Sequence, residues 1–203
     1  VERSRGLGDV YKRQQILIDP KYNYPEDNLS MLYHDPEYAK KLFEVTENIG
    51  NSDYRYARLY TKDGSKYANR KFYEVQDAKF KNMMPLIRMS EMYYIAAEAL
   101  NAANRGKEAV ELLNIVRRKR GIAEVNDLKT NLSAEDITEE IEKEWRKEFL
   151  GEGQMFYFYK RLGYSKIPNS NIPATELVYV LQIPEDEINV GGREPNVSTD
   201  KEK

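Results

Sequence analysis

The sequence contains no cysteine, one histidine and one tryptophan in 203 residues. The lack of cysteine excludes a thiol nucleophile, a cysteine-rich zinc site and any disulfide framework. A Ser-His-Asp arrangement would have to use His34, which lies in LYHDPEY directly before a predicted helix start. We interpret His34 as the neighbour of a helix cap, and we predict no catalytic residue, no metal site and no cofactor.

Long apolar runs are also missing. No stretch approaches the roughly 18 apolar residues that a membrane-spanning helix needs. Residues 1–14, VERSRGLGDVYKRQ, lack the apolar centre of a secretory signal. They show no periodicity that continues into the rest of the chain, so we interpret them as an artefact of cloning or assembly. Without cysteine, the chain also contains no site for lipid attachment.

Neither sign of charge is in excess, because 32 basic residues face 34 acidic ones. This balance argues against nucleic acid as a partner. The basic run Arg117–Arg120 is predicted to end a helix, where cations complement the helix dipole. Glutamates recur every four residues along a later helix, and a glycosidase pair could be drawn from them. We favour a solvated or salt-bridged face for these residues: Glu140, Glu144, Glu148 and Glu152.

Tyrosine is abundant, with 16 residues. Its flat ring and hydroxyl suit a sugar-stacking surface, but they equally suit a helix interface. Three tyrosines lie in an irregular segment over residues 15–34, and three lie in or beside an alternating run before Asp63-Gly64, which predicts a β-hairpin with a tyrosine face. The candidate ligand-binding residues are therefore Tyr22, Tyr24, Tyr33, Tyr54, Tyr56 and Tyr60.

Helical periodicity dominates the remainder. Asp35-Pro36 predicts a helix start, with Gly50 as its end and an apolar stripe of Ala39, Leu42, Phe43 and Thr46. A second stripe begins after Pro85 and comprises Met89, Tyr93, Ala96, Leu100 and Ala103. A third comprises Ala109, Leu112, Leu113 and Val116, and Gly121 closes that helix.

The second and third stripes predict a helical hairpin of tetratricopeptide type. We expect Glu91 and Glu98 on its first helix to pair with Arg117. A lone hairpin cannot bury its own apolar face, so other helices must cover it. If they are missing, we expect marginal stability.

Ser133 and Asp136 predict a capping box. The helix that follows carries Ile137, Ile141, Trp145 and Phe149 at four-residue spacing. A short helix over Gln154–Leu162, an extended run over Val178–Ile183 and a disordered tail over 191–203 complete the prediction. The expected fold is mainly α: a tetratricopeptide-like hairpin, further helices, long irregular loops and a small β-hairpin in one domain over 15–190.

Four blocks in order resemble the SusD/RagB family. Glu144–Gly163, EWRKEFLGEGQMFYFYKRLG, is similar to the family's E-R-R-R-E-L-x-x-E-G-H-R-x-x-D-L-x-R-W-G. The others are Met84–Asn101 (MPLIRMSEMYYIAAEALN), Leu112–Ile122 (LLNIVRRKRGI) and Gln182–Asn189 (QIPEDEIN). Apolar residues replace charged family residues at Trp145 and Phe158, which puts the family's charged network in this region in doubt.

The resemblance implies the C-terminal part of a nutrient-binding lipoprotein of the Bacteroidetes outer membrane. Such a protein is displayed on the cell surface, anchored by a lipid on a cysteine that this chain does not contain. It captures oligosaccharides, or in some members peptides, for a SusC-like TonB-dependent transporter, and it breaks no bond. Two alternatives from other classes are a tetratricopeptide-type adaptor for protein partners and a glycoside hydrolase.

Overall fold

The computed structural model describes residues 15–17, 33–63, 66–69, 83–85, 87–168, 176–180 and 182–194. The chain divides into two compact units, Val1–Gly151 and Glu152–Lys203, and each is described by itself. Helices dominate the described residues, which confirms the expected mainly α class. Tyr22, Tyr24 and the tail beyond residue 194 lie outside the described ranges.

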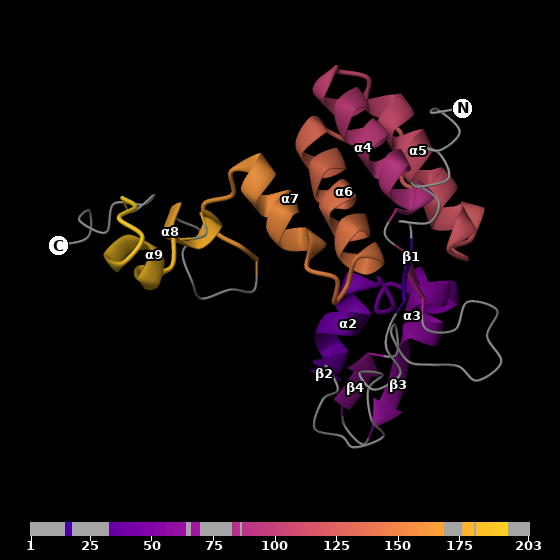
Figure 1. The fold of residues 1–203 in the computed structure, drawn as a ribbon. Helices are drawn as coiled ribbons and strands as arrows, with labels where there is room; N and C mark the ends of the chain where they lie inside the picture. The colour runs from indigo at the N-terminus through magenta and orange to yellow at the C-terminus, as the bar shows by residue number, and fades with distance from the viewer. Residues whose placement is uncertain are drawn as a thin grey trace, which may run out of the picture. The chain divides into compact units, whose positions relative to one another are not determined.

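Three helices form the core of the first unit. They are α4 (Met89–Ala102), α5 (Gly106–Lys119) and α6 (Ala134–Glu148), and each packs against the other two (Figure 1). A tight turn joins α4 to α5, with Asn104 in the left-handed region at φ 59°. Helix α6 thus covers one side of the α4–α5 pair, as the unpaired apolar face required.

The cap and the apolar stripe of helix α6 follow the sequence prediction. Ser133 accepts the Asp136 backbone N–H at 3.1 Å, and the Asp136 carboxylate accepts the Ser133 N–H in return, so the capping box is confirmed. The four apolar residues at four-residue spacing are all buried. The rings of Trp145 and Phe149 lie 4.7 Å apart and pack one turn from each other.

Helix α4 is rotated relative to the prediction. Its buried residues are Ser90, Tyr94 and Ala97, whereas Met89 is 73% exposed. The predicted stripe was therefore wrong by one position. The error has a physical cause: the polar residues Ser90 and Asn101 lie on the side that packs against α6, where Ser90 donates to Glu148 and Asn101 donates to the Ala134 carbonyl.

Helix α5 buries Ala109, Leu113 and Val116, as its pattern predicted. Gly121 follows the helix at φ 99°, and a Cβ there would collide with the Ser52 carbonyl oxygen. The segment after α5 is attached back to that helix. Asn114 donates to the Leu128 carbonyl at 3.0 Å and accepts the Leu128 N–H at 2.8 Å.

The first predicted helix is shorter than expected. Asp35 caps α2 (Pro36–Leu42), accepting the Glu37 N–H at 3.0 Å. Ala39, Leu42 and Phe43 are buried, but the helix ends at Leu42 and Thr46 is exposed. The chain turns at Glu44 instead, and Gly50 begins a 3₁₀ turn, η2 (Gly50–Ser52), rather than ending the helix.

The tyrosine-rich segment begins as a helix, α3 (Tyr54–Leu59), which contradicts the prediction of a strand through Tyr54 and Tyr56. The strands start later: β3 (Tyr60–Asp63) pairs antiparallel with β4 (Lys66–Asn69). Strand β2 (Tyr33–His34) pairs with the other edge of β4. Separately, β1 (Gln15–Leu17) pairs antiparallel with β5 (Met83–Pro85).

The second unit contains α7 (Gln154–Leu162), α8 (Glu176–Tyr179) and α9 (Glu185–Asn189). The bounds of α7 match the prediction, and Phe158 and Tyr159 are buried. Val178 and Tyr179 are helical, so the extended run expected there was wrong. Across the ranges that the structure describes, no helix has both the length and the apolarity to cross a bilayer.

Candidate functional site

Four of the six candidate tyrosines lie within the described residues, and they are divided between α3 and two strands of one sheet. Tyr33 begins β2 and Tyr60 begins β3, on either side of β4. Tyr54 is 53% exposed on α3, whereas Tyr56 is half-buried with its ring 5.6 Å from that of Phe43. Residues two apart on a helix point in different directions, so Tyr54 and Tyr56 are not side by side.

Between those two tyrosines lies Arg55, which is buried. Its guanidinium donates to both carboxylate oxygens of Asp53, with Nη2 at 2.8 Å from Oδ2 and Nε at 3.0 Å from Oδ1. Asp53 also accepts the Arg55 backbone N–H at 2.9 Å and so caps the first turn of α3. A charge pair two residues apart therefore stabilises a helix where the sequence alternation indicated a strand.

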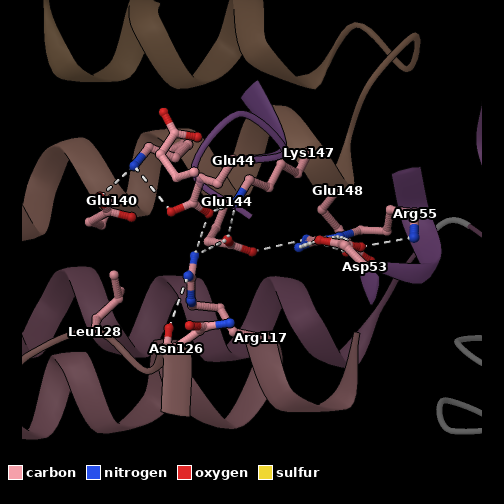
Figure 2. A network of polar contacts seen from close by, with 12 residues as sticks. Glu44, Asp53, Arg55, Arg117, Asn126, Leu128, Glu140, Glu144, Lys147 and Glu148 are labelled. Carbon is pink, nitrogen blue, oxygen red and sulfur yellow. Dashed lines mark hydrogen bonds and ion pairs between the residues drawn. The ribbon is translucent and has the colours of Figure 1, made fainter. Parts of the chain in front are cut away.

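Arg55 is one member of a buried ionic network that extends into α5 and α6 (Figure 2). Its Nη1 lies 2.9 Å from Glu144. Glu144 also contacts Lys147 at 2.9 Å and Arg117 at 3.2 Å, so three cations surround one carboxylate. Glu44, in the turn after α2, contacts Arg117 at 2.8 Å and Lys147 at 2.5 Å.

Glu148 extends the same network one turn further along α6. Its carboxylate contacts Arg120 at 2.5 Å and Arg55 at 3.3 Å, and it accepts the Ser90 hydroxyl at 2.9 Å. Ser90 belongs to the first turn of α4. The network therefore connects α3, α4, α5, α6 and the turn at Glu44.

Charge within this network is balanced. The cations Arg55, Arg117, Arg120 and Lys147 match the anions Glu44, Asp53, Glu144 and Glu148 one for one. Balance matters because a buried charge without a partner costs several kcal/mol, on the order of 3–5 when one partner is removed.

The cations also keep the carboxylates ionised. Burial alone would raise the pKa of Glu44, but the charges of Lys147 and Arg117 outweigh it and lower that pKa to about 2. For Glu144, burial is likewise opposed by Arg55, Lys147 and Arg117, which hold its pKa well below its usual range. The pKa of Glu148 is lowered too, against burial, by Arg120 and Arg55.

This electrostatics does not suit a glycosidase pair, in which the general acid needs a raised pKa. Glu144 and Glu148 have lowered pKa values and are surrounded by cations. The interpretation of these residues as salt-bridged is confirmed, but they are buried rather than solvated. The described residues also contain no group of three or more His, Asp or Glu side chains arranged to hold a metal ion.

The partners of Arg117 differ from the expected ones. We expected Arg117 to pair with Glu91 and Glu98, but the structure pairs it with Glu44 and Glu144. The sequence analysis missed Glu44, Asp53, Arg55 and Lys147 altogether. Glu44 and Lys147 lie 103 residues apart, so no local pattern could have joined them.

This arrangement of helices has counterparts among known proteins. The family model of the SusD family matches residues 11–171, which is most of the chain. The chain belongs to the SusD family. A curated relative, SusD-like protein P38 of Formosa agariphila, is 23% identical over 167 residues, covering 75% of this chain and 33% of its own length. This SusD-family chain thus spans about a third of that relative.

Two solved structures are also similar to this chain. A putative sugar-binding protein from Bacteroides vulgatus is 22% identical with a TM-score of 0.52, covering 77% of this chain and 37% of its own. A SusD-like carbohydrate-binding protein from the same species is 32% identical with a TM-score of 0.46, covering 60% of this chain and 25% of its own. The first shows that the helical fold is shared.

Proposed function

We propose that this chain is part of a nutrient-capture protein on the outer-membrane surface. The protein binds an oligosaccharide, does not cleave it, and delivers it to a SusC-like TonB-dependent transporter. The observation that carries this proposal is the match to the SusD family over residues 11–171. The ionic network adds support for a non-catalytic role, because its carboxylates are held ionised by cations.

Among the candidate contacts, Tyr54 has the geometry that a sugar-stacking platform needs. Its side chain is half exposed while its neighbours Asp53 and Arg55 are buried in the network. Its backbone N–H donates to the Arg120 carbonyl at 2.8 Å, which attaches the start of α3 to the end of α5. A ring presented from a rigid backbone loses little conformational entropy when a ligand binds.

The test is calorimetric titration of the complete gene product with a panel of oligosaccharides, followed by the variants Tyr54→Ala and Tyr54→Phe. Loss of one stacking contact should weaken binding by roughly 1 kcal/mol, about fivefold, whereas Tyr54→Phe should bind almost normally. Tyr157→Ala is the matched control, because Tyr157 is an exposed tyrosine (66%) on α7 in the other unit.

Three results would contradict the proposal at different levels. Equal binding by Tyr54→Ala and the unchanged protein would remove Tyr54 from the site but leave oligosaccharide capture intact. Failure to bind any oligosaccharide, together with specific binding of peptides, would change the ligand class. Binding of folded intracellular proteins alone would favour the tetratricopeptide-type adaptor instead.

A further inference from the structure

Helix α4 has an unusual exposed face. Five residues of this helix are exposed, and all five are apolar: Met89, Met92, Ile95, Ala99 and Ala102. They follow one another at steps of three, three, four and three residues, so they form one continuous stripe along the helix. We call these five residues the α4 seam.

The neighbouring helix shows that this face is not ordinary for the molecule. Five of the six exposed residues of α5 are charged, and Ile115 is the exception. Three large side chains of the seam, Met89, Met92 and Ile95, are between 43% and 73% exposed. A charged face is stable in water, whereas a long stripe of this kind marks a surface that another element covers.

The opposite side of α4 is already packed. Tyr94 and Ala97 are fully buried there, and α5 and α6 supply the contacts. Apart from Glu91 and Glu98, both half-buried, α4 carries no charged residue. The polar residues Ser90 and Asn101 contact α6. A helix whose other side is apolar belongs between two layers of a domain.

We propose that the α4 seam is the docking site of another helix of the same polypeptide, from the part of a SusD-family protein that this chain does not span. The length of the relatives supports this occupant, because the chain covers only 33% of one relative and 37% of another. The spacing of the seam fits a helix as partner. The absence of charge requires that the contacting face of that helix is apolar too.

The side chains of the seam become smaller along the helix. Methionine and isoleucine occupy its first half, and alanines occupy its second half. Small side chains at Ala99 and Ala102 leave space beside α4, and larger side chains of the docked helix can fill that space. Near Met89 and Met92 it must carry smaller ones.

This chain contains no cysteine, so labelling of a thiol introduced into it can be followed on the peptide that carries the substitution. A single cysteine is introduced at Ala99 in the seam or, as matched control, at Glu111, an exposed residue in the middle of α5. Thiol labelling rates are then compared between the 203-residue chain and the polypeptide encoded by the complete gene. We expect Ala99→Cys to react at least about tenfold more slowly in the complete polypeptide, because buried thiols react only through local opening. Glu111→Cys should react equally fast in both.

Several outcomes would overturn the proposal. Equal labelling of Ala99→Cys in both polypeptides would show that no helix covers the seam. Protection that appears in the chain alone and grows with its concentration would identify a second copy as the occupant. A complete gene that adds no helix-forming sequence would also exclude it. Oligosaccharide binding does not enter the readout, so the seam and the proposed function fail independently.

Discussion

Helices α6 and α4 reverse the usual placement of charge in opposite ways. α6 buries four charged side chains, Glu142, Glu144, Lys147 and Glu148, whereas the five exposed residues of α4 are all apolar. In α6 the burial is compensated within this chain, since each of these residues contacts an opposite charge. The exposed apolar side chains of the α4 seam have no such compensation, and their contact with water costs free energy. The difference teaches that a side chain is placed by its partner: among the described residues the buried charges of α6 contact opposite charges, whereas the α4 seam is exposed.

Removal of the central carboxylate should have the largest effect on this contrast. Glu144→Ala leaves Arg55, Arg117 and Lys147 buried with too few anions, so we expect it to lower the free energy of unfolding by about 3–5 kcal/mol. Glu139→Ala, at an exposed position of the same helix, should change it by no more than about 0.5 kcal/mol. Urea unfolding of both variants measures the difference, and equal small losses would show that the network does not stabilise the fold.

Acidification should weaken the same network without any mutation. The pKa of Glu44 is about 2 in the folded chain against 4.5 as its ordinary value, and the pKa of Glu144 and of Glu148 is also lowered. A lowered folded pKa adds stability that is complete above the ordinary value and is lost as pH falls toward the folded one. We therefore expect the free energy of unfolding to fall from about pH 5 toward pH 2. Urea titrations across that range, with Glu44→Gln as the variant that flattens the profile, provide the measurement.

The basic run offers a graded comparison within four residues. Side chains there are exposed to different degrees: Arg117 to 1%, Arg120 to 33% and Arg118 to 44%. Alanine at Arg117 should cost about 3 kcal/mol or more, because two carboxylates lose a buried partner. Arg118→Ala removes a surface pair with Asp127 and should cost about 1 kcal/mol or less, with Arg120→Ala between them. A different rank order in thermal melts would contradict the assignment of Arg117 to the centre of the network.

We expect the smallest change in stability from a substitution in the α4 seam. In the chain alone, Met92→Lys should change the free energy of unfolding by no more than about 0.5 kcal/mol, because the methionine is 43% exposed and the lysine head can reach water. Tyr94→Ala, two residues away on the buried face, should cost about 3–5 kcal/mol. A large loss from Met92→Lys in this chain would mean that the seam is already covered.

The sequence predicted what a local pattern can encode. In α6, four apolar residues at equal spacing after a capping box left one orientation possible, and the structure has it. In α4 the same reasoning failed because the side that carries Ser90 and Asn101 packs against α6, while the opposite, apolar side is exposed. The strand prediction for Tyr54–Leu59 was wrong for another reason. The Asp53–Arg55 pair and the network partners of Arg55 stabilise a helix there and outweigh the strand-like alternation. The network itself joins residues that are many tens of positions apart, which composition and spacing do not reveal.

Glu44 combines an unfavourable backbone conformation with a side chain that the ionic network requires. Its backbone adopts φ 57°, a conformation that suits glycine or asparagine better than glutamate. Its carboxylate nevertheless has to reach both Arg117 and Lys147. A substitution that relaxes the backbone but removes the carboxylate leaves Arg117 and Lys147 to share Glu144, and one that keeps the charge keeps the strain. Positions 44, 117 and 147 are consequently coupled in energy, so the effects of substitutions at these three positions should not add.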